Sequence, residues 1–272
     1  MILFVIIFIV TCLIIATYLF LIAPAYNARD SFSQGLASPY AHRGLHGGED
    51  PENSMGAFRN AVSYGCGIEL DVRLSADGEV VVFHDDNLKR VCGIARAVNT
   101  ITASDLAGIS LMGTEHTIPR LKDVLRLVDG VVPLLIELKG EDKNTALCDK
   151  LFPMLDNYSG AFCIESFNPL LLKYVKEHRP AYIRGQLVDI LSKESYNGSP
   201  IVRFMLSHLL LNVLSRPHFI AYNYKKKPAL GIWICENIFG ARKFAWTVKD
   251  KNTFTALKNK DATSIFEGFL PY

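Results

Sequence analysis

The chain has 272 residues, half of them hydrophobic, with 29 Lys and Arg against 27 Asp and Glu. This length suits one α/β barrel, and a core of that size needs no disulfide bonds. The net charge of +2 is not the clustered basic excess of a nucleic-acid-binding protein, so we expect no nucleic-acid partner. None of the six cysteines forms a Cys-x-x-Cys pair, which argues against a zinc knuckle and favours buried free thiols.

An uncharged apolar segment covers residues 2–23. It has the ~20 residues that a helix needs to cross a bilayer. A secretory signal peptide would have a basic start and a shorter apolar stretch of about 7–15 residues, and a soluble core helix would be polar on one face. We favour an uncleaved single-pass transmembrane anchor at residues 1–24, followed by a polar linker at 25–38. The flanking charges favour neither side of the membrane.

From residue 39 onward, apolar stretches typical of strands alternate with helical patterns. The expected strands are residues 39–41, 68–74, 80–83, 131–138, 162–165, 183–188, 219–222, 244–248 and 264–266. The expected helices are 53–64, 121–128, 144–155, 169–178, 201–214, 230–239 and 249–258, and residues 93–117 look irregular. About eight such alternating units predict parallel strands closed into a (β/α)8 TIM barrel over residues 39–272.

Two segments raise the question of a second membrane contact. Residues 201–214 are too short and polar to cross a bilayer, and we favour their packing on the barrel over docking on a membrane surface. Lysines 225–227 fit the solvated start of a helix better than a contact with anionic lipid headgroups.

The side chains suited to catalysis lie on or just after the predicted strands. Glu69 and Asp71 are two apart on one strand, so both point to the same face. Glu137 and Lys139 are two apart at the end of residues 131–138, and His42 follows the first strand. Because barrel active sites lie at the carboxyl ends of the strands, we expect these residues to meet at one rim.

These residue types match the needs of phosphodiester cleavage. A carboxylate pair can hold Ca²⁺ or Mg²⁺, both of which prefer oxygen ligands and neutralise phosphate charge. Arg43 can bind a phosphate through its two-pronged guanidinium, and Lys139 can bind one as a point charge. His42 and His84 have a reference pKa of about 6.5, which suits the transfer of protons to and from the reacting oxygens at neutral pH.

Taken singly, some of these residues have ordinary structural explanations. Either histidine could be a loop residue, and Glu137 with Lys139 could be a simple ion pair. Two acidic residues on an otherwise apolar strand are harder to explain, because buried unpaired carboxylates are costly. Trp246 fits the hydrophobic core or the wall of a glycerol pocket, and we favour the wall.

Several motifs resemble those of the glycerophosphodiester phosphodiesterase family. In chain order between residues 40 and 271 they are Ala41-His42-Arg43-Gly44, Pro51-Glu52-Asn53-Ser54, Ile68-Glu69-Leu70-Asp71-Val72, Asp77-Gly78 through His84-Asp85, Ile136-Glu137-Leu138-Lys139 and Trp246-Thr247-Val248. The resemblance implies a TIM barrel that uses a divalent cation to hydrolyse glycerophosphodiesters to glycerol 3-phosphate and an alcohol.

The resemblance also implies a role for each matching residue. His42 and His84 would be the acid/base pair, and Glu69, Asp71 and Glu137 would be the metal ligands. Arg43 and Lys139 would hold the phosphate, and Glu52 would support the metal site.

The chain departs from the commoner family pattern at two places. Many members have Thr-Asp before the last proline, where this chain has Glu267 followed by Gly268, and many have Asn after Trp-Thr-Val, where this chain has Lys249. Both changes would alter the rim of the pocket, and so the choice of substrate more than the chemistry.

We therefore expect a membrane-anchored hydrolase whose substrates are glycerophosphodiesters derived from phospholipids, or lysophospholipids. We hypothesise that the glycerol hydroxyl beside the ester attacks first, giving a cyclic phosphate that water then opens. One alternative is a phospholipase D-like lyase that stops at the cyclic phosphate. Another is a non-catalytic, membrane-tethered phosphoglycerol-binding protein.

Overall fold

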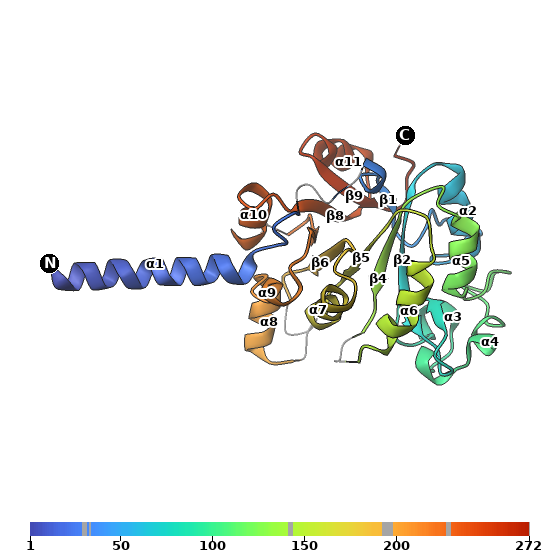
Figure 1. The fold of residues 1–272 in the computed structure, drawn as a ribbon. Coiled ribbons are helices and arrows are strands. Elements are labelled where there is room, and N and C mark those ends of the chain that lie inside the picture. Colours follow the sequence, from blue (N-terminus) through green and yellow to red (C-terminus); the bar gives the residue numbers. More distant parts are fainter. Residues whose placement is uncertain (29–31, 33, 141–143, 192–197, 227–229, 272) are drawn as a thin grey trace.

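A computed structural model describes residues 1–271 except 29–31, 33, 141–143, 192–197 and 227–229. Within these residues, eight parallel strands form a barrel surrounded by helices (Figure 1). The barrel strands are β1 (Tyr40–Ala41), β2 (Gly67–Leu74), β4 (Leu134–Leu138), β5 (Phe162–Ser166), β6 (Arg184–Val188), β7 (Phe219–Asn223), β8 (Arg242–Val248) and β9 (Ala262–Phe266). The pairing of β1 with both β2 and β9 closes the sheet, which confirms the predicted TIM barrel.

The side chains inside the barrel change from apolar to acidic along the barrel axis. On β4 the side chain of Leu135 packs with apolar residues at the amino-terminal end, whereas Glu137 lies two residues further along. On β5 Cys163 and Glu165 repeat this order. Residues two apart on a strand share a face, so the interior turns from apolar to acidic toward the carboxyl ends of the strands.

The strand β3 (Val80–Val82) lies outside the barrel and pairs with β2 in antiparallel fashion. The chain after it contains the short helices α3 (Lys89–Cys92) and α4 (Ala103–Leu106) at the edge of the barrel (Figure 1). This excursion has its own apolar cluster, which includes Phe83, Leu88 and Leu111. The irregular pattern predicted for residues 93–117 corresponds to it.

The helices on the outside of the barrel follow the predicted ranges within a few residues. They are α2 (Met55–Ser63), α5 (Leu121–Val128), α6 (Ala146–Asp156), α7 (Pro169–His178), α10 (Leu230–Asn237) and α11 (Lys251–Lys258). In α5 the buried residues are Leu121, Val124, Leu125 and Val128, at the spacing that places side chains on one face of a helix. This face packs against the strands.

The single helix predicted over residues 201–214 is wrong. The structure has two helices there, α8 (Pro200–Ser207) and α9 (Asn212–Ser215). Between them, Leu209 has a φ of +61° and is buried, so the chain bends to bring an apolar side chain into the core at the cost of helical continuity.

The helix α1 (Ile2–Ile22) projects away from the barrel (Figure 1). It is long and apolar enough to cross a membrane, a property that an N-terminal signal sequence shares. Its last turn is held by the domain: Arg216 donates to the carbonyl oxygens of Phe20 and Ala23, both at 2.8 Å, and Asn212 donates to that of Ile22 at 3.0 Å. The orientation of α1 on the domain is therefore defined by several contacts.

Several of the described residues in the predicted linker at 25–38 pack on the barrel, although Tyr26 is exposed. Ala25, Ala28 and Leu36 are buried, and the ring of Phe32 lies 5.6 Å from that of Phe219. Residues 29–31 and 33 of this predicted segment lie outside the described residues.

Helix α2, which follows the Pro51–Ser54 motif, begins with a side-chain cap. The Ser54 hydroxyl accepts a hydrogen bond from the Ala57 backbone N–H at 3.1 Å. We predict that Ser54→Ala lowers the free energy of unfolding by about 1 kcal/mol, and that Ser54→Gly lowers it by only a few tenths of a kcal/mol. Urea denaturation measures both, and an alanine variant as stable as the wild-type chain would contradict this account of the helix start.

Candidate active site

Three acidic side chains meet inside the barrel near the carboxyl ends of β2 and β4. The side chains of Glu69, Asp71 and Glu137 each offer an oxygen, and these oxygens lie within 4.8 Å of one another. Asp71 and Glu137 are partners in the register of the two strands. All three residues are buried, with exposed fractions of 2%, 1% and 8%. The three acidic residues therefore lie together, as predicted from their positions on the strands.

Burial and the repulsion between the three carboxylates shift the pKa values within this cluster. Burial raises the pKa of Glu69 well above its usual value, and repulsion by Asp71 and Glu137 adds to the rise. Burial, together with Asp71, also raises the pKa of Glu137 to about 7, although Lys139 opposes the shift. Burial alone would raise the pKa of Asp71, but the positive charges of Lys139, His84 and Arg43 hold it well below its usual range.

Lys139 lies directly on the cluster, as its spacing from Glu137 predicts. Its Nζ is 2.9 Å from Asp71 Oδ1 and 2.7 Å from Glu137 Oε1. Burial lowers the pKa of Lys139, but the two carboxylates outweigh burial and raise it. One ammonium thus faces two of three carboxylates, which leaves a donor set of oxygens that fits a hard divalent cation such as Ca²⁺ or Mg²⁺.

Arg43 links the cluster to Glu52. Its backbone N–H donates to Glu69 at 2.8 Å, and its guanidinium Nη1 donates to Glu52 Oε1 at 2.7 Å. The Glu52 carboxylate also accepts two hydrogen bonds from Arg90, at 2.6 and 2.9 Å. The structure therefore places Glu52 between two arginines, and its connection to the acidic cluster passes through Arg43.

The imidazole of His42 is held by a carboxylate from the far end of the chain. Its Nδ1 lies 2.9 Å from Glu267 Oε2, and the Nζ of Lys249 donates to Glu267 Oε1 at 2.9 Å. The hydrogen bond from His42, together with Lys249, lowers the pKa of Glu267 to about 2. The two residues that depart from the family pattern therefore contact each other, and one of them orients His42.

The second histidine has a similar support. The Nδ1 of His84 lies 2.6 Å from Asp85 Oδ1, and Arg90 donates to the same carboxylate from Nε at 2.7 Å. Burial lowers the pKa of His84, as do the charges of Lys139 and Arg43. Both predicted catalytic histidines thus use Nδ1 to meet a carboxylate, which leaves Nε2 for another partner.

The indole of Trp246, on β8, forms part of an apolar wall near the carboxyl ends of the strands. Its ring lies 5.8 Å from that of Phe167 in an edge-to-face arrangement, and Phe167 is 39% exposed. Trp246 is half-buried, and its Nε1 has no hydrogen-bond partner among the described residues. This position is compatible with the pocket wall that the sequence predicts.

The sequence analysis missed three residues that contact the cluster, adjoin it or belong to the ion pairs around it. Asn53 donates to Asp71 Oδ2 at 2.8 Å, and Arg90 connects Glu52 to Asp85. Glu165 lies on β5 opposite Glu137 and is buried. Glu165 could have been found by the rule applied to Glu69, since it is a carboxylate on an otherwise apolar strand.

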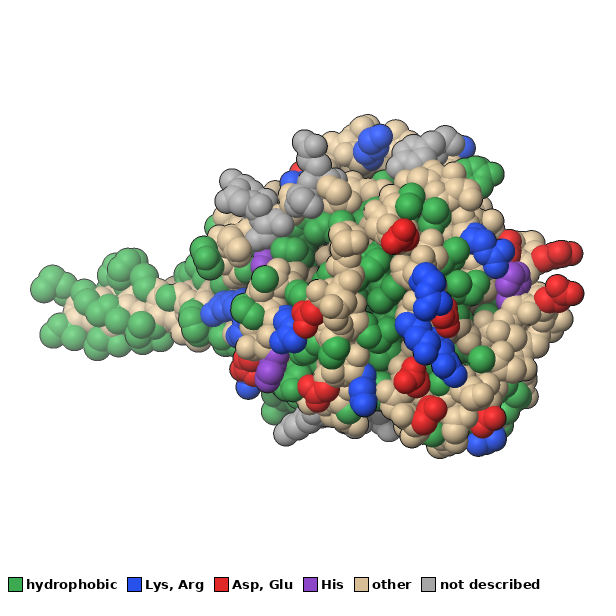
Figure 2. Space-filling view, turned by 45° about the vertical axis from the view of Figure 1, so that its right-hand side comes forward, with side chains coloured by type: hydrophobic (Ala, Val, Ile, Leu, Met, Phe, Trp, Pro, Cys, Tyr) green, Lys and Arg blue, Asp and Glu red, His purple; other side chains and the backbone are tan. Residues whose placement is uncertain are grey.

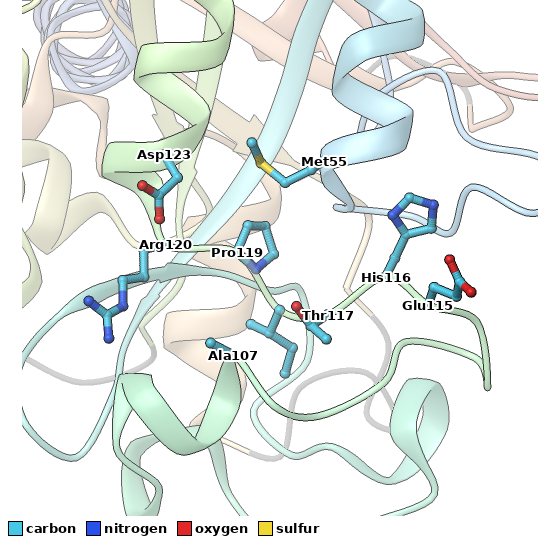
Figure 3. A pocket seen from close by; sticks show the side chains of 9 residues that line it. Met55, Ala107, Glu115, His116, Thr117, Pro119, Arg120 and Asp123 are labelled. Carbon is cyan, nitrogen blue, oxygen red and sulfur yellow. The ribbon is translucent and has the colours of Figure 1, made fainter.

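Two further groups contain potential metal ligands or space for a small molecule. His42, His46 and Glu267 also bring ligand atoms within 4.8 Å of one another. A separate cavity of about 250 Å³ lies between α2, α5 and the excursion (Figure 3). Met55, His116 and Arg120 are among the residues that line it, and its lining includes none of the described residues predicted to act on phosphate.

Glu165 generates a prediction about stability and pH. Its Oε2 has no hydrogen-bond partner among the described residues, and burial followed by repulsion from Glu137 raises its pKa well above the usual value. The folded chain therefore holds a proton that the unfolded chain releases, so this group lowers stability as the pH rises above about 4.3. We predict that Glu165→Gln raises the melting temperature at pH 8 but changes it little at pH 4.

Thermal unfolding of both chains at the two pH values, with a chelator present, measures this difference. An equal effect of the substitution at pH 4 and pH 8 would show that ionisation of Glu165 does not oppose folding.

Comparisons with known proteins agree with the geometry of the site. A sequence profile of the glycerophosphoryl diester phosphodiesterase family matches residues 42–267. A Bacillus subtilis protein, named provisionally as a glycerophosphodiester phosphodiesterase, is 27% identical over 80% of this chain and 88% of its own length. The lysophospholipase D of Rattus norvegicus is 29% identical over 73% of this chain and 61% of its own length.

The fold also matches a solved structure. A phosphodiesterase of Oleispira antarctica, determined in complex with the product sn-glycerol-3-phosphate, superposes with a TM-score of 0.69, at 23% identity. The match covers 84% of this chain and 91% of that one. The profile match spans most of the chain and includes the carboxylate cluster and both histidines, and the chain therefore belongs to the glycerophosphoryl diester phosphodiesterase family.

Proposed function

We propose that this enzyme hydrolyses glycerophosphodiesters to glycerol 3-phosphate and an alcohol, using a divalent cation and two histidines. The observation that carries the proposal is the pairing of three buried carboxylates with two imidazoles, each oriented by an acidic residue. Such a set supplies a cation site and two groups that transfer protons. Glu69, Asp71 and Glu137 would hold the cation.

The two histidines divide the work of proton transfer. An imidazole whose Nδ1–H donates to a carboxylate has its lone pair on Nε2, where it can accept a proton from the attacking hydroxyl. The other imidazole, protonated on both nitrogens, gives a proton to the leaving alkoxide. Glu267 and Asp85 would keep His42 and His84 in the orientations that these roles need.

The phosphate would be held by positive charge at the mouth of the barrel. Ca²⁺ or Mg²⁺, when bound, would neutralise the charge of the non-bridging oxygens. Lys139 and Arg43 already lie against the carboxylates and would turn toward the phosphate, Arg43 with its fork and Lys139 as a point charge. Trp246 would contact the glycerol.

The order of bond changes decides between a hydrolase and a lyase. We propose that the glycerol hydroxyl beside the ester attacks the phosphorus, and that water opens the resulting cyclic phosphate. A time course of glycerophosphocholine cleavage followed by ³¹P NMR should end in glycerol 3-phosphate. A cyclic phosphate that persists would indicate the lyase, and binding without turnover in the presence of Ca²⁺ or Mg²⁺ would indicate a non-catalytic binding protein.

We propose that α1 remains attached as a single-pass membrane anchor at residues 1–24, ahead of the enzyme domain at 39–272. Ile22 is fully buried in an apolar cluster, and its carbonyl oxygen accepts hydrogen bonds from Asn212 and Cys235. Cleavage beyond this point would remove a core side chain and leave buried donors unpaired, which is costly. Signal cleavage therefore fits the packing less well than retention.

The first prediction of the proposed mechanism concerns the histidines. We expect His42→Ala and His84→Ala each to lower kcat by at least about 10²-fold, the contribution typical of general acid–base catalysis. His178→Ala, an exposed position on α7, is the control. Turnover of glycerophosphocholine measures the effect, and circular dichroism checks the fold. Wild-type turnover in either variant would refute the assignment.

The second prediction concerns the cation. We expect Glu69→Gln to weaken Ca²⁺ or Mg²⁺ binding by more than the roughly 10- to 100-fold that loss of an outer partner costs. Gln keeps an oxygen for the Arg43 N–H but removes the negative charge. Calorimetric titration of the metal measures the affinity, with Glu177→Gln on the surface of α7 as the control. Equal affinities in the two variants would rule out Glu69 as a ligand.

The third prediction concerns Glu267. We expect Glu267→Gln to lower kcat by about 10- to 100-fold with little change in KM, because His42 loses the charge that orients it. Lys249→Met should have a smaller effect, since it leaves the Glu267–His42 contact in place. Steady-state kinetics separates the two parameters. A change in KM alone would mean that Glu267 acts on substrate binding at the pocket rim.

A further inference from the structure

Two helices beside the base of α1 expose large apolar side chains to solvent. These side chains lie on α8 and on or just after α10, and we call them the α8–α10 face. They are Ile201 (72% exposed), Phe204 (55%), Leu230 (65%), Trp233 (53%) and Ile238 (57%). Single exposed apolar side chains are ordinary, but five large ones on two helices that flank the base of α1 call for an explanation.

The face lies on the side of the domain from which α1 projects. In Figure 1 α8 and α10 flank the point where α1 meets the domain, one on each side. In Figure 2 hydrophobic side chains cover α1 along its length, whereas the domain surface mixes charged and apolar groups. The hydrogen bonds from Arg216 and Asn212 hold the end of α1, so α8 and α10 keep a defined position beside its base.

The length of α1 limits how far the domain can stand from a bilayer. Residues 2–17 are exposed, whereas Tyr18 and Leu19 pack against the domain and Ile22 is buried. Sixteen residues (2 through 17) at about 1.5 Å each give ~24 Å of free helix. The hydrocarbon core of a bilayer is about 30 Å thick. The free part of the helix is shorter than this thickness, so a bilayer of average thickness would extend to the last turn of α1 and to the domain surface around its base.

The residues at this level have the character of a membrane interface. Trp and Tyr concentrate where hydrocarbon meets headgroups, and Trp233 and Tyr18 lie on neighbouring helices here, where Gly231 of α10 lies close to the Tyr18 hydroxyl. The guanidinium of Arg216 lies 4.8 Å from the centre of the Phe20 ring, so a positive charge lies at the level where α1 meets the domain.

We propose that the α8–α10 face is embedded in the lipid interface of the same bilayer that α1 spans. The inference rests on the proposed retention of α1 and adds a second, peripheral contact through which the domain is seated on its membrane. Residues 201–207 thus form a membrane-docked helix, the interpretation that the sequence analysis placed second. Lys225 and Lys226 precede α10, and Lys227 lies outside the described residues.

Tryptophan fluorescence in lipid vesicles tests the proposal, because the chain has two tryptophans. Trp246→Phe leaves Trp233 as the reporter, and Trp233→Phe leaves Trp246 inside the barrel. The full-length variants are inserted into phosphatidylcholine vesicles with or without bromine atoms on the upper acyl chains. We expect bromine to reduce Trp233 emission about 2-fold or more, since interfacial side chains reach about 5–10 Å into the boundary. Trp246 emission should stay unchanged.

A second pair of variants tests α8 without relying on α10. In a chain lacking both native tryptophans, Phe204→Trp should be quenched by the brominated lipid. Tyr64→Trp in the same background is the matched control, because Tyr64 is 56% exposed, close to the 55% of Phe204. Tyr64 is the residue that ends α2, and α2 lies across the barrel from α8 (Figure 1). Turnover of glycerophosphocholine by Trp233→Phe confirms that the domain is folded.

The outcomes separate this proposal from those on which it rests. A chain that stays in the vesicles after alkaline extraction, but whose α8 and α10 reporters are not quenched, would overturn the docked face and leave the anchor intact. Emission from Trp233 that depends on the protein-to-lipid ratio and not on bromine would assign the face to a second copy of the chain. A chain extracted at alkaline pH would contradict both the anchor and the face, with turnover still testing the catalytic assignment.

Discussion

The arrangement of side chains at the candidate active site depends on the burial of several acidic groups close together inside the barrel. Glu69, Asp71 and Glu137 point inward from two paired strands, where water cannot screen their repulsion. Burial of carboxylates without a counter-charge is costly, so the site is stable only with cations against it. Lys139 provides one such charge from the end of β4. A fold that keeps these groups together at the expense of stability holds a cluster of oxygen ligands of the kind that a divalent cation prefers.

The cost of burying carboxylates without a counter-charge also explains the series of ion pairs beside the cluster. His84, Asp85, Arg90, Glu52 and Arg43 are connected in series, and each carboxylate in the series meets at least one cation. A second, shorter series consists of His42, Glu267 and Lys249. Glu267 and Lys249 are the residues at which the chain differs from its family pattern, so the difference affects the contacts of His42, for which we propose a role in proton transfer.

Most of the barrel and the centre of the site could be predicted from the sequence, because both depend on local patterns. Alternating strands and helices, and carboxylates two apart on apolar strands, are visible without a structure. The contact of Glu267 with His42 could not be predicted, since it joins residues 225 positions apart through the closure of the barrel. The break at Leu209 was missed because an apolar residue at a bend has the same hydropathy as one in a helix. The packing of residues 25–28 on the barrel was missed because small and polar residues resemble a linker.

The most direct test of the central claim is the position of the cation. Crystals grown with Mn²⁺, an oxygen-preferring ion with a strong anomalous signal, would reveal where a divalent metal binds. The account predicts one anomalous peak between the carboxylates of Glu69, Asp71 and Glu137, with Lys139 displaced from them. A peak between His42, His46 and Glu267 instead, or none at the acidic cluster, would contradict it.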